Sequence, residues 1–347
     1  MKKAINKRGG GMKMKRRQFC FSLGGLAVCH SLGIPLTAKD KNTEGPGYLN
    51  LHLNGELKKR GQSLWERMEK CDLCPRDCGA KRLEGQAGFC GASSDLQVSS
   101  YNPHFGEERP LVGTRGSGTV FFTHCGLRCV FCINWDISHH GAGRRVSLDD
   151  LAAMMLDLQR IGCHNINVVT PTHYLPHIIL ALDAAASKGL RLPLVYNTCG
   201  WEKMDVLQKL DGVADIYLPD FKYAHSDMAS KYSPEAVTYP EITQSALLEM
   251  HRQVGTASPE GRKPMKKGLM IRHLVMPSYV QNSKDVMTWI AENLPADTYV
   301  NIMSQYQPVF LASRYPSINR RVTRQEYNEV VRHARNLGLT QLDIQGR

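Results

Sequence analysis

The sequence predicts an α/β fold built as a partial barrel of six strand–helix units. Two observations predict it: short apolar runs recur along the chain, and amphipathic segments separate them. The runs are rich in Val, Ile, Tyr and Phe, as expected for strands buried on both faces. They lie at residues 119–123, 166–170, 193–197, 215–218, 269–276 and 299–303. Because six strands are fewer than the eight of a closed barrel, we expect an open or partial (β/α)6 barrel.

The amphipathic segments predict the crossover helices. Ser147 and Asp150 have the spacing of a capping box, and the residues after them place Leu and Met on one face. The other expected helices lie at residues 176–187, 202–210, 240–254, 283–294 and 323–337. Strand–helix alternation favours parallel strands with right-handed crossovers. In such folds the functional groups gather at the carboxyl ends of the strands.

The chain divides by composition into three expected regions. Residues 1–40 read as a leader, because the basic run KRRQF is followed by an apolar segment. The paired Arg16 and Arg17 resemble a twin-arginine signal; a basic tail beside a short apolar helix is the alternative. Residues 41–110 are expected to hold a polar, Gly-rich linker at 39–63 and a cysteine-rich segment, and residues 111–347 form the barrel core.

The net charge of +12 is concentrated near the start of the chain. Residues 1–17 contain eight Lys or Arg and no acidic residue, so the rest of the chain carries only +4. A surplus of this size is typical of a solvated surface, and a nucleic-acid partner is not expected. After residue 40 the chain has no uncharged apolar stretch of 18 residues, so the sequence predicts no membrane span there.

Seven of the eleven cysteines fall in two tight groups, which in a chain this long indicates metal sites. Residues 125–132 read CGLRCVFC and directly follow the first strand of the core. Three thiolates on one loop can hold three corners of a [4Fe–4S] cubane, whereas clusters that only carry electrons usually have four. The open iron can then take the amine and carboxylate of S-adenosylmethionine (SAM), whose S–C5′ bond breaks on reduction. A zinc site completed by His124 or His139 is the alternative.

The CGLRCVFC loop resembles the signature of the radical SAM superfamily. Further segments are similar to its pyruvate formate-lyase activating enzyme-like branch, and the likeness covers roughly residues 65–347. These segments are residues 71–78, 169–173, 217–222, 271–275 and 316–321. The resemblance implies a barrel of the radical SAM type and an oxidoreductase that forms a 5′-deoxyadenosyl radical. Cys125, Cys129 and Cys132 are then the catalytic metal ligands.

The resemblance also assigns residues to the SAM pocket. Phe131 is expected against the adenine. Thr170 and Thr172 end the second strand, where the family has a Gly-Gly-Glu-like motif that meets the SAM amine, so this chain lacks the carboxylate. Asn197 and Thr198 match a family segment near the SAM carboxylate in which an acid helps to hold a monovalent cation; here Asn197 replaces that acid.

The later strands add further polar groups to the expected pocket. Asp220 and Lys222 are two residues apart, so they face the same side of the fourth strand; a surface ion pair is the alternative. Asp220 is suited to a cation or a ribose hydroxyl, and Lys222 to a carboxylate. The resemblance places His273 near SAM, although a satisfied core histidine is also consistent with its strand. Gln305 and Tyr306 are expected at the substrate opening.

The second cysteine group has the spacing C-x2-C-x3-C-x11-C and consists of Cys71, Cys74, Cys78 and Cys90. Four thiolates close a site, so it is structural or electron-transferring, and zinc and a second [4Fe–4S] cluster suit it equally. Of the single cysteines, Cys163 is expected in the core and Cys199 in the pocket.

Two functions are consistent with these patterns. The first is a radical SAM enzyme that abstracts hydrogen from a substrate, such as a protein glycine in the manner of glycyl-radical activases. It would need a donor such as flavodoxin or ferredoxin. The second is a non-catalytic iron–sulfur electron carrier. The need for SAM and a strong reductant slightly favours the cytoplasm, while the twin-arginine-like leader keeps periplasmic export as the alternative.

Overall fold

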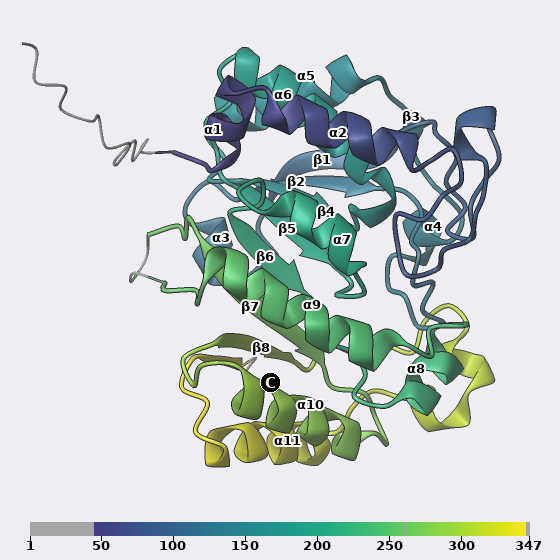
Figure 1. The fold of residues 1–347 in the computed structure, drawn as a ribbon. Coiled ribbons are helices and arrows are strands. Elements are labelled where there is room, and N and C mark those ends of the chain that lie inside the picture. Colours follow the sequence, from purple (N-terminus) through teal and green to yellow (C-terminus); the bar gives the residue numbers. More distant parts are fainter. Residues whose placement is uncertain (1–44, 260, 262, 345–347) are drawn as a thin grey trace, which may run out of the picture. The chain divides into compact units, whose positions relative to one another are not determined.

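The structure is a computed structural model that describes residues 45–259, 261 and 263–344. The proposed leader, residues 1–40, lies outside this part. Figure 1 shows a central sheet with helices packed along it. The strands are β1 Gln97–His104, β2 Ser117–Phe122, β3 Arg144–Arg145, β4 Ile166–Val169, β5 Leu194–Thr198, β6 Ile216–Pro219, β7 Gly268–Leu274, β8 Tyr299–Met303 and β9 Leu342–Ile344.

The sheet has the strand order β3-β1-β2-β4-β5-β6-β7-β8-β9. From β2 to β9 every neighbouring pair is parallel, whereas β1 pairs antiparallel with β2 and with β3. The predicted α/β fold with a mostly parallel sheet is therefore confirmed, and all six expected strands lie next to one another in the order of the chain. The partial barrel stays a prediction.

The first two helices precede the first strand in the chain, and most of the later helices connect consecutive parallel strands as crossovers. The helices are α1 Tyr48–Leu53, α2 Glu56–Glu66, α3 Arg109–Val112, α4 Trp135–Ser138, α5 Leu148–Ile161, α6 Leu175–Ser187, α7 Met204–Leu207, α8 Ser226–Tyr232, α9 Tyr239–Val254, α10 Val280–Asn293 and α11 Arg324–Asn336. In Figure 1, α5 and α6 cover the end of the sheet that contains β2 and β4, and α10 and α11 cover β8.

Local sequence explains how these helices begin. Ser147 accepts a hydrogen bond from the Asp150 amide (3.0 Å), and the Asp150 carboxylate accepts one from the Ser147 amide (2.8 Å). This is the expected capping box, and it satisfies amides that have no partner inside the helix. Thr323 and Glu326 form the same box at the start of α11.

The structure corrects the expectation of a linker at residues 39–63, because helices α1 and α2 occupy much of this stretch. Polar and Gly residues there read as a loop, but Leu57 and Leu64 are spaced for one helical face and are fully buried. Gly61 allows the close packing of α2 on α6: a Cβ atom at this position would lie 2.8 Å from Leu180. The antiparallel strand β1 also belongs to the sheet, although its sequence lies before the expected core boundary at residue 111.

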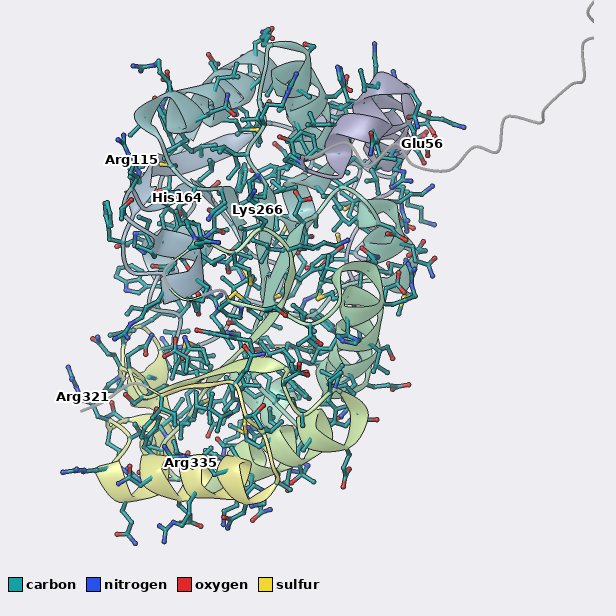
Figure 2. The ribbon with its side chains drawn as sticks, turned by 90° about the vertical axis from the view of Figure 1, so that its left-hand side faces the viewer. Glu56, Arg115, His164, Lys266, Arg321 and Arg335 are labelled. Atoms are coloured by element: carbon teal, nitrogen blue, oxygen red, sulfur yellow. The ribbon has the colours of Figure 1, made fainter. Side chains whose placement is uncertain are left out.

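Apolar residues pack on both faces of the sheet. A large cluster fills the space between the strands and the helices. A separate, smaller cluster includes the strand residues Val195, Leu218 and Met270 together with Leu111. At the amino end of β2, the amides of Thr114 and Arg115 donate to Nε2 of His164 (3.1 and 3.2 Å); Arg115 and His164 are labelled in Figure 2. This contact fastens the end of β2 that is remote from the cysteine loop.

No helix among the described residues is both long and apolar enough to span a membrane.

Candidate functional site

A cavity of about 270 Å³ opens at the carboxyl ends of the parallel strands. The residues that line it come from the ends of β2, β4, β5, β6, β7 and β8, as expected for a parallel α/β sheet. Most of the sequence-predicted site residues meet there. They are Cys125, Cys129, Cys132, Phe131, Thr170, Asn197, Thr198, Asp220 and Lys222, and the predicted Gln305 and Tyr306 line the cavity as well.

The CGLRCVFC loop leaves β2 and reaches α4 across one wall of the cavity. It turns sharply because His124 and Arg128 take left-handed conformations, with φ of 69° and 52°. Its three thiols are free. The Ser233 hydroxyl donates to the sulfur of Cys129, and the Ser138 hydroxyl donates to that of Cys132, each at 3.1 Å.

These thiols share one electrostatic environment. Burial raises the pKa of all three, and the positive charge of Lys222 acts in the opposite direction on each of them. A neighbouring thiolate of the loop also raises the pKa of each thiol. Cys132 has this effect on Cys125, Cys125 on Cys129, and Cys129 on Cys132. Cationic charge and hydroxyl donors favour the thiolate form, which is the form that ligates metals.

A buried charge network lines another part of the cavity wall. Asp220 accepts from Nζ of Lys222 (2.6 Å) and from Nε of Arg272 (2.9 Å), and Arg272 also donates to the Asn197 side chain (2.6 Å). Burial on its own would raise the pKa of Asp220, but the charges of Arg272 and Lys222 outweigh it and hold this pKa below its usual range. Asp220 is therefore a carboxylate at neutral pH, and the wall presents fixed charges of both signs.

Arg272 and Glu202 are two site residues that sequence reasoning did not assign. Arg272 is a charged residue inside the apolar run at residues 269–276, and it lines the cavity. Glu202 lies behind the cavity, 1% exposed, and accepts hydrogen bonds from Thr172 (2.7 Å), Thr198 and Tyr196 (3.4 Å). Burial raises the pKa of Glu202 to about 7 against the effect of these hydrogen bonds.

Two predicted pocket residues lie away from the cavity lining. The Thr172 hydroxyl donates to Glu202, which also accepts from Thr198, so this carboxyl links the ends of β4 and β5. His273 is fully buried, and its ring nitrogens contact the Phe221 carbonyl (2.6 Å) and the Ser283 hydroxyl (2.8 Å). This is the satisfied core histidine that the sequence left open, and both nitrogens have partners outside the pocket.

The histidines of the zinc alternative do not line the cavity either. His139 has its Nε2 3.1 Å from the Cys129 carbonyl, and His124 packs against Gly91 and Gly141. Within the part of the chain that the structure describes, no three or more His, Cys, Asp or Glu side chains are arranged around one point to bind a single metal ion, so the alternative of a zinc ion with a histidine ligand gains no support at this loop. Cys163 is buried in the core as expected, and Cys199 lines the cavity.

Comparison with known proteins identifies the architecture. The family model described as Radical SAM superfamily matches residues 119–238. The uncharacterized protein MJ0674 of Methanocaldococcus jannaschii is 30% identical over 280 residues, which cover 78% of this chain and 76% of that protein. The chain belongs to the radical SAM superfamily. This membership implies an enzyme of the radical SAM type, with a [4Fe–4S] cluster and SAM as its cofactors.

Solved radical SAM structures are more distant. Streptococcus suis SuiB bound to the precursor peptide SuiA is 13% identical, with a TM-score of 0.45, and the match covers 64% of this chain and 46% of SuiB. SuiB bound to S-adenosylmethionine is 12% identical, with a TM-score of 0.42, and the match covers 64% and 45%. This chain thus spans just under half the length of SuiB.

The residues of the cavity fit these cofactors by their chemistry. A cubane offers separate iron corners, so each of the three thiolates would bond to a different iron. SAM carries an ammonium, a carboxylate, a sulfonium and an adenosine. Lys222, Asp220 and Asn197 supply polar partners for such groups, and the Phe131 ring, which packs on Tyr306 at 5.7 Å, supplies an apolar surface.

Proposed function

We propose that this chain cleaves SAM reductively at Cys125, Cys129 and Cys132 and uses the product radical to abstract hydrogen from a substrate. The observation that carries the proposal is that three free thiols and the polar strand ends share one cavity. When bound, the cluster supplies one electron to SAM, which yields methionine and a 5′-deoxyadenosyl radical that takes a hydrogen atom from the substrate.

The chain's own residues bind and orient SAM in this proposal. The Lys222 ammonium would hold the SAM carboxylate, and Asp220 would hold a ribose hydroxyl or a cation. Arg272 donates hydrogen bonds to Asp220 and Asn197, so these groups are already in place before SAM arrives. Such preorganisation favours catalysis because the side chains need not reorganise during the reaction.

The substrate class and the branch are part of the proposal. The resemblance to the pyruvate formate-lyase activating enzyme-like branch makes a protein glycine the first hydrogen donor to test. A low-potential flavodoxin or ferredoxin would supply the electron. A deuterated glycine in the correct protein partner would transfer deuterium into 5′-deoxyadenosine and leave a glycyl radical that is visible by electron paramagnetic resonance (EPR).

The decisive experiment is anaerobic reconstitution with iron and sulfide, followed by dithionite and SAM. We expect 5′-deoxyadenosine and methionine in equal amounts, measured by liquid chromatography and mass spectrometry. A protein that binds and reduces its cluster without forming 5′-deoxyadenosine would contradict the proposal and would support the alternative, a non-catalytic electron carrier.

The working site proposed is the cytoplasm, where SAM and strong reductants are available, with periplasmic export through the twin-arginine-like leader as the alternative. Fusing residues 1–45 to a reporter that functions only after export in a folded state tests it. Export that is lost when both Arg16 and Arg17 become Lys would support the twin-arginine route. A reporter that remains in the cytoplasm would support the cytoplasmic site.

A further inference from the structure

The four-cysteine group, Cys71, Cys74, Cys78 and Cys90, has no part in the cavity. It lies between α2 and β1, in a segment whose regular structure is limited to a short 3-10 turn at Arg82–Glu84. All four thiols are free. The backbone folds back on itself, since Cys71 donates to the Ala80 carbonyl (2.9 Å) and Gly79 donates to the Cys71 carbonyl (3.0 Å).

The four thiols gather around one another. A Cβ atom on Gly88 would lie 3.3 Å from the sulfur of Cys78 and 3.5 Å from that of Cys90, so both sulfurs border the same glycine. The other two cysteines, Cys71 and Cys74, also belong to this group of thiols. Cys71 is close enough to act electrostatically on both Cys74 and Cys90. A turn-rich segment has thus been folded so that four soft ligands converge.

A fully buried cation faces this group. Arg82 is 0% exposed, and its Nη1 lies 3.7 Å from the sulfur of Cys71. The same guanidinium is fixed by the His173 carbonyl (2.8 Å) and the Ser93 carbonyl (2.7 Å), which are neutral groups. Burying a cation is unfavourable unless an anion is nearby. Among the hydrogen-bond partners of the Arg82 side chain, the Cys71 thiol is the group that can become an anion.

We propose that the four-cysteine group holds a second [4Fe–4S] cluster, which passes electrons to the cluster of the CGLRCVFC loop. Four thiolates complete the four irons of a cubane, and the resulting anionic centre matches the buried charge of Arg82. The Ala92 amide lies 3.5 Å from the sulfur of Cys90, as a donor to a ligating sulfur does. Hydrogen bonds and charge of this kind tune the reduction potential of iron–sulfur centres.

Direct contacts join the two cysteine segments. A Cβ atom on Gly126, inside the loop, would lie 3.6 Å from the sulfur of Cys74. Arg76 donates from Nε to the Gly126 carbonyl (2.9 Å), and Arg128 donates from the loop to the Cys90 carbonyl (3.3 Å). The His124 ring, next to Cys125, packs against Gly91, next to Cys90. Because electron transfer weakens steeply with distance, these contacts suit a relay.

The relay transfers one electron at a time. A reduced flavodoxin or ferredoxin would give an electron to the second cluster, which is then reoxidised as the loop cluster is reduced. The role rests on the proposed function, because the electron is needed only if SAM is cleaved. The existence of the second cluster does not rest on the proposed function, because iron content and EPR signals can be measured without SAM cleavage.

The first experiment compares metal content after anaerobic reconstitution of the full chain. The variant with Cys125, Cys129 and Cys132 all changed to Ala should retain about four irons, with a reduced EPR signal that SAM does not alter. Cys74→Ser should lose about half of the iron of the unaltered protein and keep a signal that SAM shifts. Cys163→Ala, a buried thiol outside both groups, should keep all of the iron. A triple variant with no iron, or with one zinc, would overturn the second cluster.

The second experiment tests electronic contact. EPR of the fully reduced protein should show broadening from spin coupling that is absent from the sum of the two single-cluster variants. With dithionite, Cys74→Ser should still form 5′-deoxyadenosine, whereas with reduced flavodoxin its rate should fall at least tenfold. An additive spectrum, or equal rates of the variant and the unaltered protein with flavodoxin, would overturn the relay. Failure of SAM cleavage in every protein, with dithionite as well, would instead contradict the proposed function.

Discussion

The two cysteine groups of this chain differ in the number of their thiols and in the backbone that holds them. The CGLRCVFC loop supplies three thiols from the end of strand β2, inside a cavity that other strands complete. The four-cysteine group supplies four from a turn-rich segment outside that cavity. Three thiolates leave a coordination position for chemistry, and four leave none. The difference suggests that rigid strand ends position reactive groups, while a self-contained turn segment is enough for a closed centre.

Loss of a loop cysteine should have the largest effect. We expect Cys129→Ala to reduce 5′-deoxyadenosine formation by at least 1,000-fold, roughly 4 kcal/mol or more in activation free energy, because two thiolates hold a cubane poorly. The same holds for Cys125→Ala and Cys132→Ala. The measurement is product formation after anaerobic reconstitution, with Cys163→Ala as the control. Normal turnover in any of the three variants would refute the ligand assignment.

The next largest effect concerns the charges of the cavity wall. Asp220→Asn leaves Lys222 and Arg272 buried without their shared anion, and we expect about 3–5 kcal/mol of lost stability. The matched control is Glu84→Gln in the four-cysteine segment. Glu84 pairs with Lys81 at 3.2 Å, but these side chains are 66% and 63% exposed, so its loss should cost about 0–1 kcal/mol.

Urea unfolding of the metal-free proteins measures both changes. If Asp220→Asn and Glu84→Gln lowered the unfolding free energy by similar amounts, water would reach the cavity wall as freely as it reaches the surface. SAM binding adds a second readout, since Asp220→Asn should weaken it while Glu84→Gln should leave it unchanged.

Glu202→Gln should give a smaller effect that depends on pH. Because burial raises the pKa of this carboxyl from 4.5 to about 7, the folded state keeps a proton that the unfolded state loses between these values. The unaltered protein therefore loses stability as the pH rises from about 4.5 to 7, and this contribution is flat above 7. The variant lacks this loss.

We expect the stability difference between the variant and the unaltered protein to shift by about 1–3 kcal/mol in favour of Gln between pH 5 and pH 8. The shift is found by subtracting unfolding free energies across that range. Asp215 and Glu107, whose pKa values are also raised by burial, are present in both proteins and cancel in the subtraction. A difference that is independent of pH would contradict the raised pKa.

Much of this arrangement could be predicted from local sequence. Strands of β-branched and aromatic residues and the capping box at Ser147 are short-range patterns, and the cysteine spacing that follows β2 is equally local. The position of Asp220 and Lys222 on one side of a strand follows from the two-residue period. These signals placed most of the cavity residues correctly at strand ends.

The remainder depended on packing between distant segments. Helix α2 was missed because its apolar stripe is short and becomes meaningful only against α6. Strand β1 is partly exposed, and its buried and exposed residues do not alternate clearly, so its sequence gives a weak strand signal. Glu202 follows β5 in a loop, and its link to the end of β4 exists only because the fold brings Thr172 beside it. The signal available in the sequence was an acidic residue, Glu202, directly after Trp201. That signal does not specify Thr172 as its partner.

The smallest effect should come from Cys199→Ser, and it tests the contrast between three thiols and four. Cys199 lines the same cavity as the loop cysteines, at the end of β5, so it is the described thiol best placed to act as a fourth ligand. Its backbone carbonyl accepts a hydrogen bond from Tyr239 (2.9 Å), which anchors the main chain of a separate strand end rather than that of the loop. If the open iron is kept for SAM, the side chain of Cys199 has no ligand role. We then expect unchanged iron content, an EPR signal that SAM still shifts, and 5′-deoxyadenosine formation within about twofold, or 0.4 kcal/mol, of the unaltered protein. Loss of iron in Cys199→Ser would make the loop site a closed, four-thiolate centre and would remove the difference between the two cysteine groups.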